Sequence, residues 1–210
     1  MFVGHFAAAL VGSRLEPRLR LGTAFLAAQL PDLLWPVFLL TGLEHATIVP
    51  GDTAVTPLRF DHYPWSHSLL LVAAWGAALA ALLRARGLAK PVGVVAAALV
   101  LSHWLLDFAS HRADMPLVPW SDARLGLGLW RSLPLTLAVE GALFAGAIVF
   151  YARGRRIGRG FWALVFTQTL LYLANLFGPP PPNMTAVALS ALVLFPLLWL
   201  WGNRTSASIS

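Results

Sequence analysis

The feature that most constrains this chain is a series of long apolar stretches divided by short polar segments. A helix needs about 20 apolar residues to cross a bilayer. We expect six such spans, at 21–41, from His67 to Arg84, and at about 92–108, 133–152, 160–178 and 184–201. The chain is 58% hydrophobic and 11% charged, whereas a soluble domain is nearer half apolar and a quarter charged. These patterns predict an all-α, polytopic membrane bundle.

Residues 2–13 predict one further helix, rich in alanine and glycine and too short to span. Its small residues would let it pack closely while dipping partway into the membrane. No Lys or Arg precedes its apolar part and no cleavage pattern follows it, so it does not read as a signal peptide. We expect a single integral membrane domain over 1–210, with a metal-site half at about 1–112 and the remaining helices at about 133–201.

Basic residues gather on one side of the predicted topology. That side carries Arg14, Arg18, Arg20, Arg84, Arg86, Lys90, Arg153, Arg155, Arg156, Arg159 and Arg204. The opposite side carries Arg59, Arg112, Arg124 and Arg131. By the positive-inside rule the first side is cytoplasmic, so the formal charge of +6 indicates topology and not a nucleic-acid partner.

A histidine and an aspartate stand four residues apart near the end of the third span. His103 and Asp107 would lie on one helix face, one turn apart. Ionisable side chains inside an apolar helix are costly and usually mark function. Imidazole and carboxylate are ordinary ligands of divalent ions, and the absence of cysteine excludes thiolate sites.

Other polar residues share the depth of this pair. Counting about 1.5 Å per residue from the basic ends places Asp32, His103 and Asp107 in the outer half of the bilayer. His67, at the start of its span from outside, and His5 reach a similar depth. His62 sits just above this layer, where it either lies in a solvated loop or completes the ligand shell. The sequence therefore predicts one or two divalent ions, zinc first and manganese second.

Phosphoester hydrolysis is the chemistry that these residues favour. The helix start at Ser66 and Ser68 would attract an anion such as phosphate. Arg112, Arg59 or Arg131 would clamp that anion, and Glu140 or Asp61 would act as a base. The predicted substrate is a phosphoester lipid or a lipid-linked molecule that enters from the surrounding membrane lipids at the outer leaflet.

Several short motifs occur in a familiar order: Gly4-His5, QLPD at Gln29 to Asp32, HYPWSHSLL from His62, and SHWLLD at Ser102 to Asp107. This pattern, up to about residue 110, resembles a family of bacterial inner-membrane proteins of the YdjM/YbcI type, described as membrane-bound metal-dependent hydrolases. Members commonly carry His-Arg-Gly before Thr-His-Ser. Here Tyr63 and Pro64 follow His62, and Ser66 replaces the threonine, so one arginine contact to phosphate is missing.

The ligand pattern of that family is in turn similar to the zinc-dependent phospholipase C and P1-type nucleases. This resemblance implies that His103 and Asp107 form the ligand pair, with Asp32, His67 and His5 as further ligands. A second His-x-x-x-Asp/Glu pair is missing from the sequence, so a three-zinc cluster is not expected.

Two other functions use the same residues. A transporter or channel for divalent metal or protons would need ionisable groups along a path to the cytoplasm, and stretches such as VAAWGAALAALL and VVAAALVL offer none. A structural protein with a metal staple would need a closed coordination shell. The oligomeric state cannot be read from this sequence.

Overall fold

The computed structural model describes residues 1–205 of the chain, so the last five residues of the expected domain lie outside the described part. The helices are α1 (Val3–Leu15), α2 (Leu21–Ala28), α3 (Leu30–Leu40), α4 (Pro64–His67), α5 (Leu69–Ala85), α6 (Lys90–Ser110), α7 (Leu133–Ala152), α8 (Arg159–Phe177) and α9 (Met184–Arg204), with a 3-10 turn η1 (Leu129–Arg131). The strands are β1 (His45–Ile48), β2 (Leu58–His62), β3 (Met115–Pro116) and β4 (Arg124–Leu125).

The helices confirm the all-α membrane class. Helices α6, α7, α8 and α9 are long and apolar enough to cross a membrane, and α2 with α3 forms a fifth span if the bent pair is counted as one. Helix α5 has 17 residues, which is shorter than a typical crossing. Within residues 1–205 the count is thus four or five spans, and the expected six is not confirmed.

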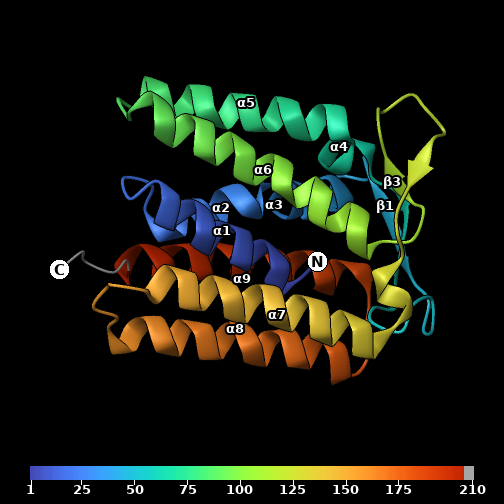
Figure 1. Ribbon diagram of the computed structural model, residues 1–210. Coiled ribbons are helices and arrows are strands. Elements are labelled where there is room, and N and C mark those ends of the chain that lie inside the picture. The colour runs from blue at the N-terminus through green and yellow to red at the C-terminus, as the bar shows by residue number, and fades with distance from the viewer. Residues whose placement is uncertain (206–210) are drawn as a thin grey trace.

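The helices are arranged around the short helix α1 (Figure 1). The pair α5 and α6 lies on one side, and α7 and α8 lie on the other, with α1, α2 and α3 between them. Helix α1 begins in the middle of the bundle and packs against α2, α6 and α7. Its 13 residues extend roughly 20 Å, so it runs from the interior to one end only.

The two ends of the bundle differ in structure. The turns after α1, α5 and α7 and the end of α9 meet at one end, which carries most of the basic residues (Figure 1). The other end is capped by two small antiparallel sheets, β1 with β2 and β3 with β4. The polar segments 42–65 and 111–132 therefore contain short strands, and α4 follows β2 closely.

A break in the first span positions the site. Helices α2 and α3 meet at Gln29 with a bend of 52°. Pro31 lacks a backbone N–H and so cannot continue the hydrogen-bond ladder of α2. Gly22 on α2 faces Gly202 on α9; a Cβ atom on Gly22 would collide with α9, and one on Gly202 would come within 3.0 Å of Gly22. The close contact fixes α2, so the bend turns the start of α3, with Asp32, toward the centre of the bundle.

Candidate functional site

His103 and Asp107 lie one turn apart on the buried face of α6, as their spacing predicts. Nε2 of His103 is 3.0 Å from Oδ2 of Asp107. The other ring nitrogen, Nδ1, lies 2.7 Å from the carbonyl oxygen of Ala28, at the end of α2. A carbonyl only accepts, so Nδ1 carries the proton and Nε2 keeps its lone pair. Two acceptor atoms 3.0 Å apart require a cation or a shared proton between them.

His67 is oriented by a chain of buried hydrogen bonds. The Ser66 hydroxyl donates to Oε2 of Glu44 over 2.6 Å, and the Ser66 amide donates to Oε1 over 2.8 Å. With its proton used in this way, the hydroxyl oxygen accepts from Nδ1 of His67, 2.7 Å away. Nε2 of His67 therefore also presents a lone pair, 3.5 Å from Oδ1 of Asp32 and 3.9 Å from Oδ2 of Asp107.

Asp32 completes a compact set of four ligand atoms. Its Oδ1 lies 3.7 Å from Nε2 of His103. The nitrogen–oxygen separations in this set run from 3.0 to 3.9 Å. A tetrahedral ion with bonds of 2.0–2.1 Å holds its ligand atoms about 3.3 Å apart. Asp32, His67 and His103 therefore form a group of side chains that could hold one metal ion, and Oδ2 of Asp107 lies within 3.9 Å of both imidazole nitrogens.

His5 reaches the opposite oxygen of the same aspartate. Its Nε2 is 3.1 Å from Oδ1 of Asp107, and its ring stacks on His103 with centroids 3.8 Å apart. The backbone nitrogen of Met1 contacts the same Oδ1 and lies 3.2 Å from the Ser110 hydroxyl. His5, His103 and Asp107 form a second group of side chains that could hold a metal ion, besides Asp32, His67 and His103.

The structure thus brings together five of the six residues predicted as ligands, and His62 is the exception. His62 ends β2 with an exposed side chain, and its nearest aromatic neighbour is His45 on β1, with ring centroids 6.5 Å apart. Its backbone belongs to the hairpin, which turns the ring away from the buried cluster.

The predicted base Asp61 also lies in this exposed hairpin. It accepts hydrogen bonds from Thr47 and Arg59 within the hairpin. Asp61 and Arg59 therefore pair with each other and do not join the buried histidines and aspartates.

The predicted phosphate contacts are likewise used elsewhere. Arg112 pairs with Asp52 over 2.8 Å and with Asp114 over 3.1 Å, and Arg131 is exposed at η1. Helix α4 is a single turn, and the Ser66 hydroxyl already binds Glu44. Ser68 caps α5 by accepting from the amide of Leu71. The Ser66 amide and hydroxyl are thus engaged by Glu44, and the expected anion site at this helix start stays a prediction.

A polar cluster outside the spans ties the two loops together above the site. Asp114 accepts from Tyr63 over 2.9 Å and contacts Nδ1 of His111 at 3.0 Å. Burial alone would raise the pKa of Asp114, but the bonds to His111, Tyr63 and Arg112 hold that pKa below its ordinary value. Burial and the neighbouring Asp114 raise the pKa of Tyr63. The cluster keeps Asp114 ionised and braces the cap.

Of the predicted catalytic residues, Glu140 lies next to the buried histidines and aspartates of the possible metal site. It is fully buried on α7, and its Oε2 accepts from the amide of Phe2 over 2.9 Å. Together with Asp32 it lines an inner pocket of about 170 Å³. Asp32 is the most open of the ligand side chains, with 29% of its surface exposed against 4% or less for the others. The inner pocket therefore gives access to the possible metal site.

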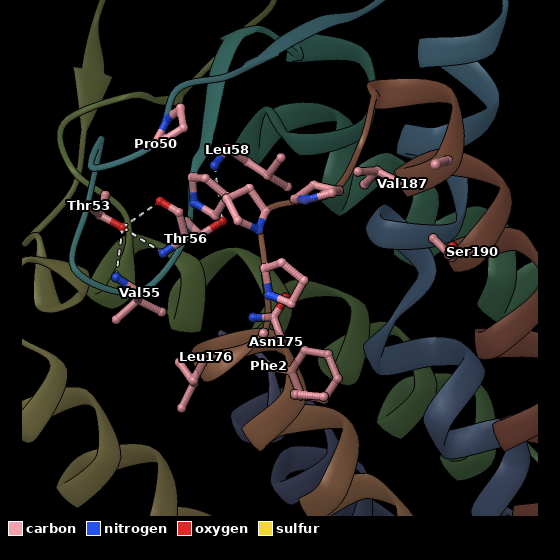
Figure 2. A pocket seen from close by; sticks show the side chains of 18 of the residues that line it. Phe2, Pro50, Thr53, Val55, Thr56, Leu58, Asn175, Leu176, Val187 and Ser190 are labelled. Carbon is pink, nitrogen blue, oxygen red and sulfur yellow. Dashed lines mark hydrogen bonds between the residues drawn. The ribbon is translucent and has the colours of Figure 1, made fainter.

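An outer pocket of about 490 Å³ adjoins the inner one and shares Phe2, Val55, Thr56 and Leu58 with it. Figure 2 shows its wall, where the hydroxyl of Thr53 holds the loop by bonding the amides of Val55 and Thr56. The four prolines at 179–182 and the start of α9 form the other side. Charged residues are missing from this lining within residues 1–205, so the outer pocket suits an uncharged, largely apolar group.

Sequence reasoning missed Glu44 and the Ala28 carbonyl, which orient two of the imidazoles. Glu44 has no exposed surface, although it follows directly on the polar end of the first span. The Ala28 carbonyl is available because the helix breaks at the next residue. A proline in an apolar span, such as Pro31, accounts for this break, but it does not indicate which side chain would use the freed carbonyl.

Comparison with known proteins places the whole region in one family. The family model described as YdjM inner membrane protein matches residues 1–181. The match extends past the short motifs to include α7 and α8, which supply Glu140, Tyr172 and Asn175 to the inner pocket. No curated protein and no solved structure matches the chain, so the distant similarity to phospholipase C and P1-type nucleases is not shown.

Proposed function

The chain belongs to the YdjM inner membrane protein family, and we propose that this member is a metal-dependent hydrolase that cleaves a phosphoester of a lipid or lipid-linked substrate. The observation that carries the proposal is the convergence of imidazole nitrogens and carboxylates in two overlapping groups that could hold a metal ion, beside a pocket. A zinc ion suits this donor set, which lacks thiolates, and manganese is the second candidate.

The residues divide the work by position. Asp32, His67, His103 and Asp107 would hold the ion, while Glu44 with Ser66 and the Ala28 carbonyl keep the two imidazoles in the ligating tautomer. A divalent ion held there supplies Lewis acidity, which polarises a phosphoryl oxygen and acidifies water. Burial of the cluster keeps bulk water away from every ligand except Asp32.

Two observations favour hydrolysis over the alternatives. A metal staple would be closed, whereas Asp32 opens onto the inner pocket. Transport would need ionisable groups between the site and the basic end. The buried residues of α2, and those of α6 before His103, are apolar or glycine throughout. The pockets lie at the end of the bundle opposite the basic loops, so we propose that substrate enters from the outer leaflet.

Metal analysis of purified protein tests the proposal. We expect the wild type to hold a stoichiometric divalent ion, and the double variant His103→Ala with Asp107→Ala to lose it. Metal-dependent release of phosphate or phosphate ester from mixed lipids should disappear in the same variant.

The matched control is His45→Ala with His62→Ala, which removes two exposed imidazoles from the hairpin. This variant should keep both the ion and the activity. Full retention of metal by the His103/Asp107 variant would overturn the site, and metal binding without hydrolysis of any phosphoester lipid would overturn the reaction.

A further inference from the structure

The inner pocket has walls made largely of aromatic rings. Beside Asp32 and Glu140 it is lined by six aromatic residues from six parts of the chain: Phe2, Trp35, Phe60, Trp130, Tyr172 and Phe195. Phe2 stacks on Tyr172, and Trp35 packs against Phe60. Aromatic faces carry partial negative charge and attract cations, most strongly where water is excluded.

Several buried polar atoms in this lining have no partner among the described residues. They are Oε1 of Glu140, the hydroxyl of Tyr172, and the indole nitrogens of Trp35 and Trp130. Buried polar groups without partners cost about 1–3 kcal/mol each, so a group of them around one pocket indicates a ligand. Glu140 supplies the charged acceptor and the indoles supply donors.

A structural role accounts for only one of the two carboxylate oxygens of Glu140. Its Oε2 holds the start of α1 by accepting from the amides of Phe2 and Gly4. Its Oε1 has no such task, although the residue is fully buried. An uncharged glutamine would anchor α1 through its carbonyl oxygen equally well, so the anchoring role does not account for the negative charge.

The charged side chains that line the pocket are acidic. Asp32 and Glu140 are acidic, and neither arginine nor lysine lines the pocket in the described part of the chain. The amino group of Met1, which also lines the pocket, contacts Asp107, whereas Glu140 forms no ion pair among the described residues. A ligand with a positive group at the Glu140 end would neutralise it.

We propose that the inner pocket binds a substituted ammonium group, with Glu140 as its counter-ion and the surrounding rings as a cation–π cage. The inference rests on the proposed function and names its substrate class: a phosphoester that also carries an ammonium group, so that the phosphate meets the metal ligands while the cation meets Glu140. The apolar outer pocket receives the remainder of the molecule.

Equilibrium dialysis of radiolabelled choline against the metal-free, full-length chain in detergent tests the cage alone. We expect saturable binding by the wild type. Glu140→Gln keeps the anchor on α1 and removes the charge, and it should weaken binding about tenfold or more. The control is Glu16→Gln, another buried glutamate, which binds Arg18 at the basic end and should leave choline binding unchanged.

A second pair of variants separates the contribution of the Tyr172 ring to choline affinity from that of its hydroxyl. Tyr172→Phe keeps the aromatic face and should retain most of the affinity, whereas Tyr172→Leu should lose it. Thermal unfolding of each variant checks that it is folded. Absence of saturable choline binding by the wild type, or equal affinity of folded Glu140→Gln, overturns the proposal.

Two substrates with the same headgroup distinguish a lipid from a free ester. Phosphatidylcholine in nanodiscs and soluble glycerophosphocholine are compared with phosphatidylglycerol, which has no ammonium. We expect hydrolysis of the phosphatidylcholine in preference to both. Choline binding without hydrolysis of any ester would overturn the proposed hydrolase function and support the cage. Equal hydrolysis of phosphatidylglycerol without choline binding would support the hydrolase function and overturn the cage.

Discussion

At the scale of single residues, the site depends on which nitrogen of each imidazole carries the proton. His67 and His103 use Nδ1 as a donor toward different acceptors, the Ser66 hydroxyl and the Ala28 carbonyl. In both rings Nε2 is left to ligate. His5 differs, because its buried Nδ1 has no partner among the described residues and its ring is held by stacking on His103.

Replacement of Ser66 by alanine should therefore weaken metal binding without touching a ligand. The change breaks the link from Glu44 to His67 and frees the ring to rotate or change tautomer. Loss of such a support typically costs about 10–100-fold in metal affinity. Competition with a fluorescent chelator measures the affinity of the purified variant.

Ser68→Ala is the matched control, two residues along the chain. Ser68 caps α5 and forms no hydrogen bond to a histidine among the described residues, so its loss should cost about 1 kcal/mol of stability and leave metal affinity unchanged. Equal effects of the two substitutions on metal affinity would contradict the orienting role of Ser66.

At the scale of helices, the bend between α2 and α3 creates half of the site. A straight span would carry the Ala28 carbonyl in its own ladder and point Asp32 along another face. The bend of 52° at Gln29 frees the Ala28 carbonyl for His103 and turns Asp32 toward the other ligands. Helix α6, in contrast, is unbroken and supplies its pair by ordinary helical spacing.

Pro31→Ala tests the importance of this bend. Alanine restores the missing donor and lets α2 continue, so Asp32 should move away and metal affinity should fall about tenfold or more. Pro36→Ala, inside α3 beyond the site, removes a proline without restoring that donor and should keep the metal. Unchanged metal affinity in Pro31→Ala would show that tertiary packing alone maintains the bend.

At the scale of the whole molecule, the bundle has a basic end and an end capped by strands. The polar cluster of Tyr63, Asp114 and Arg112 braces the cap directly above the pockets. The family is an inner-membrane one, and positive loops remain on the cytoplasmic side of such membranes. The pocketed end is therefore expected to face outward.

Because the chain contains no cysteine, single substitutions report this orientation directly. Asp122→Cys places a thiol on the exposed cap, and Arg156→Cys places one on the turn between α7 and α8. In intact cells a membrane-impermeant maleimide should label the first and not the second. After membrane disruption both should react, and the reverse pattern in intact cells would overturn the proposed orientation.

The sequence by itself determined the membrane class and the shared depth of the polar residues. Hydropathy and basic loops measure height along a helix, since each residue adds a constant rise, and on that measure His5, Asp32, His67, His103 and Asp107 fall in one layer. The sequence gives no comparable measure of where a residue lies across the bundle. Only tertiary structure decided that His62 and Asp61 turn outward in a hairpin, that Glu44 folds inward behind His67, and that α7 brings Glu140 beside Asp32, because these placements depend on packing between segments far apart in the chain.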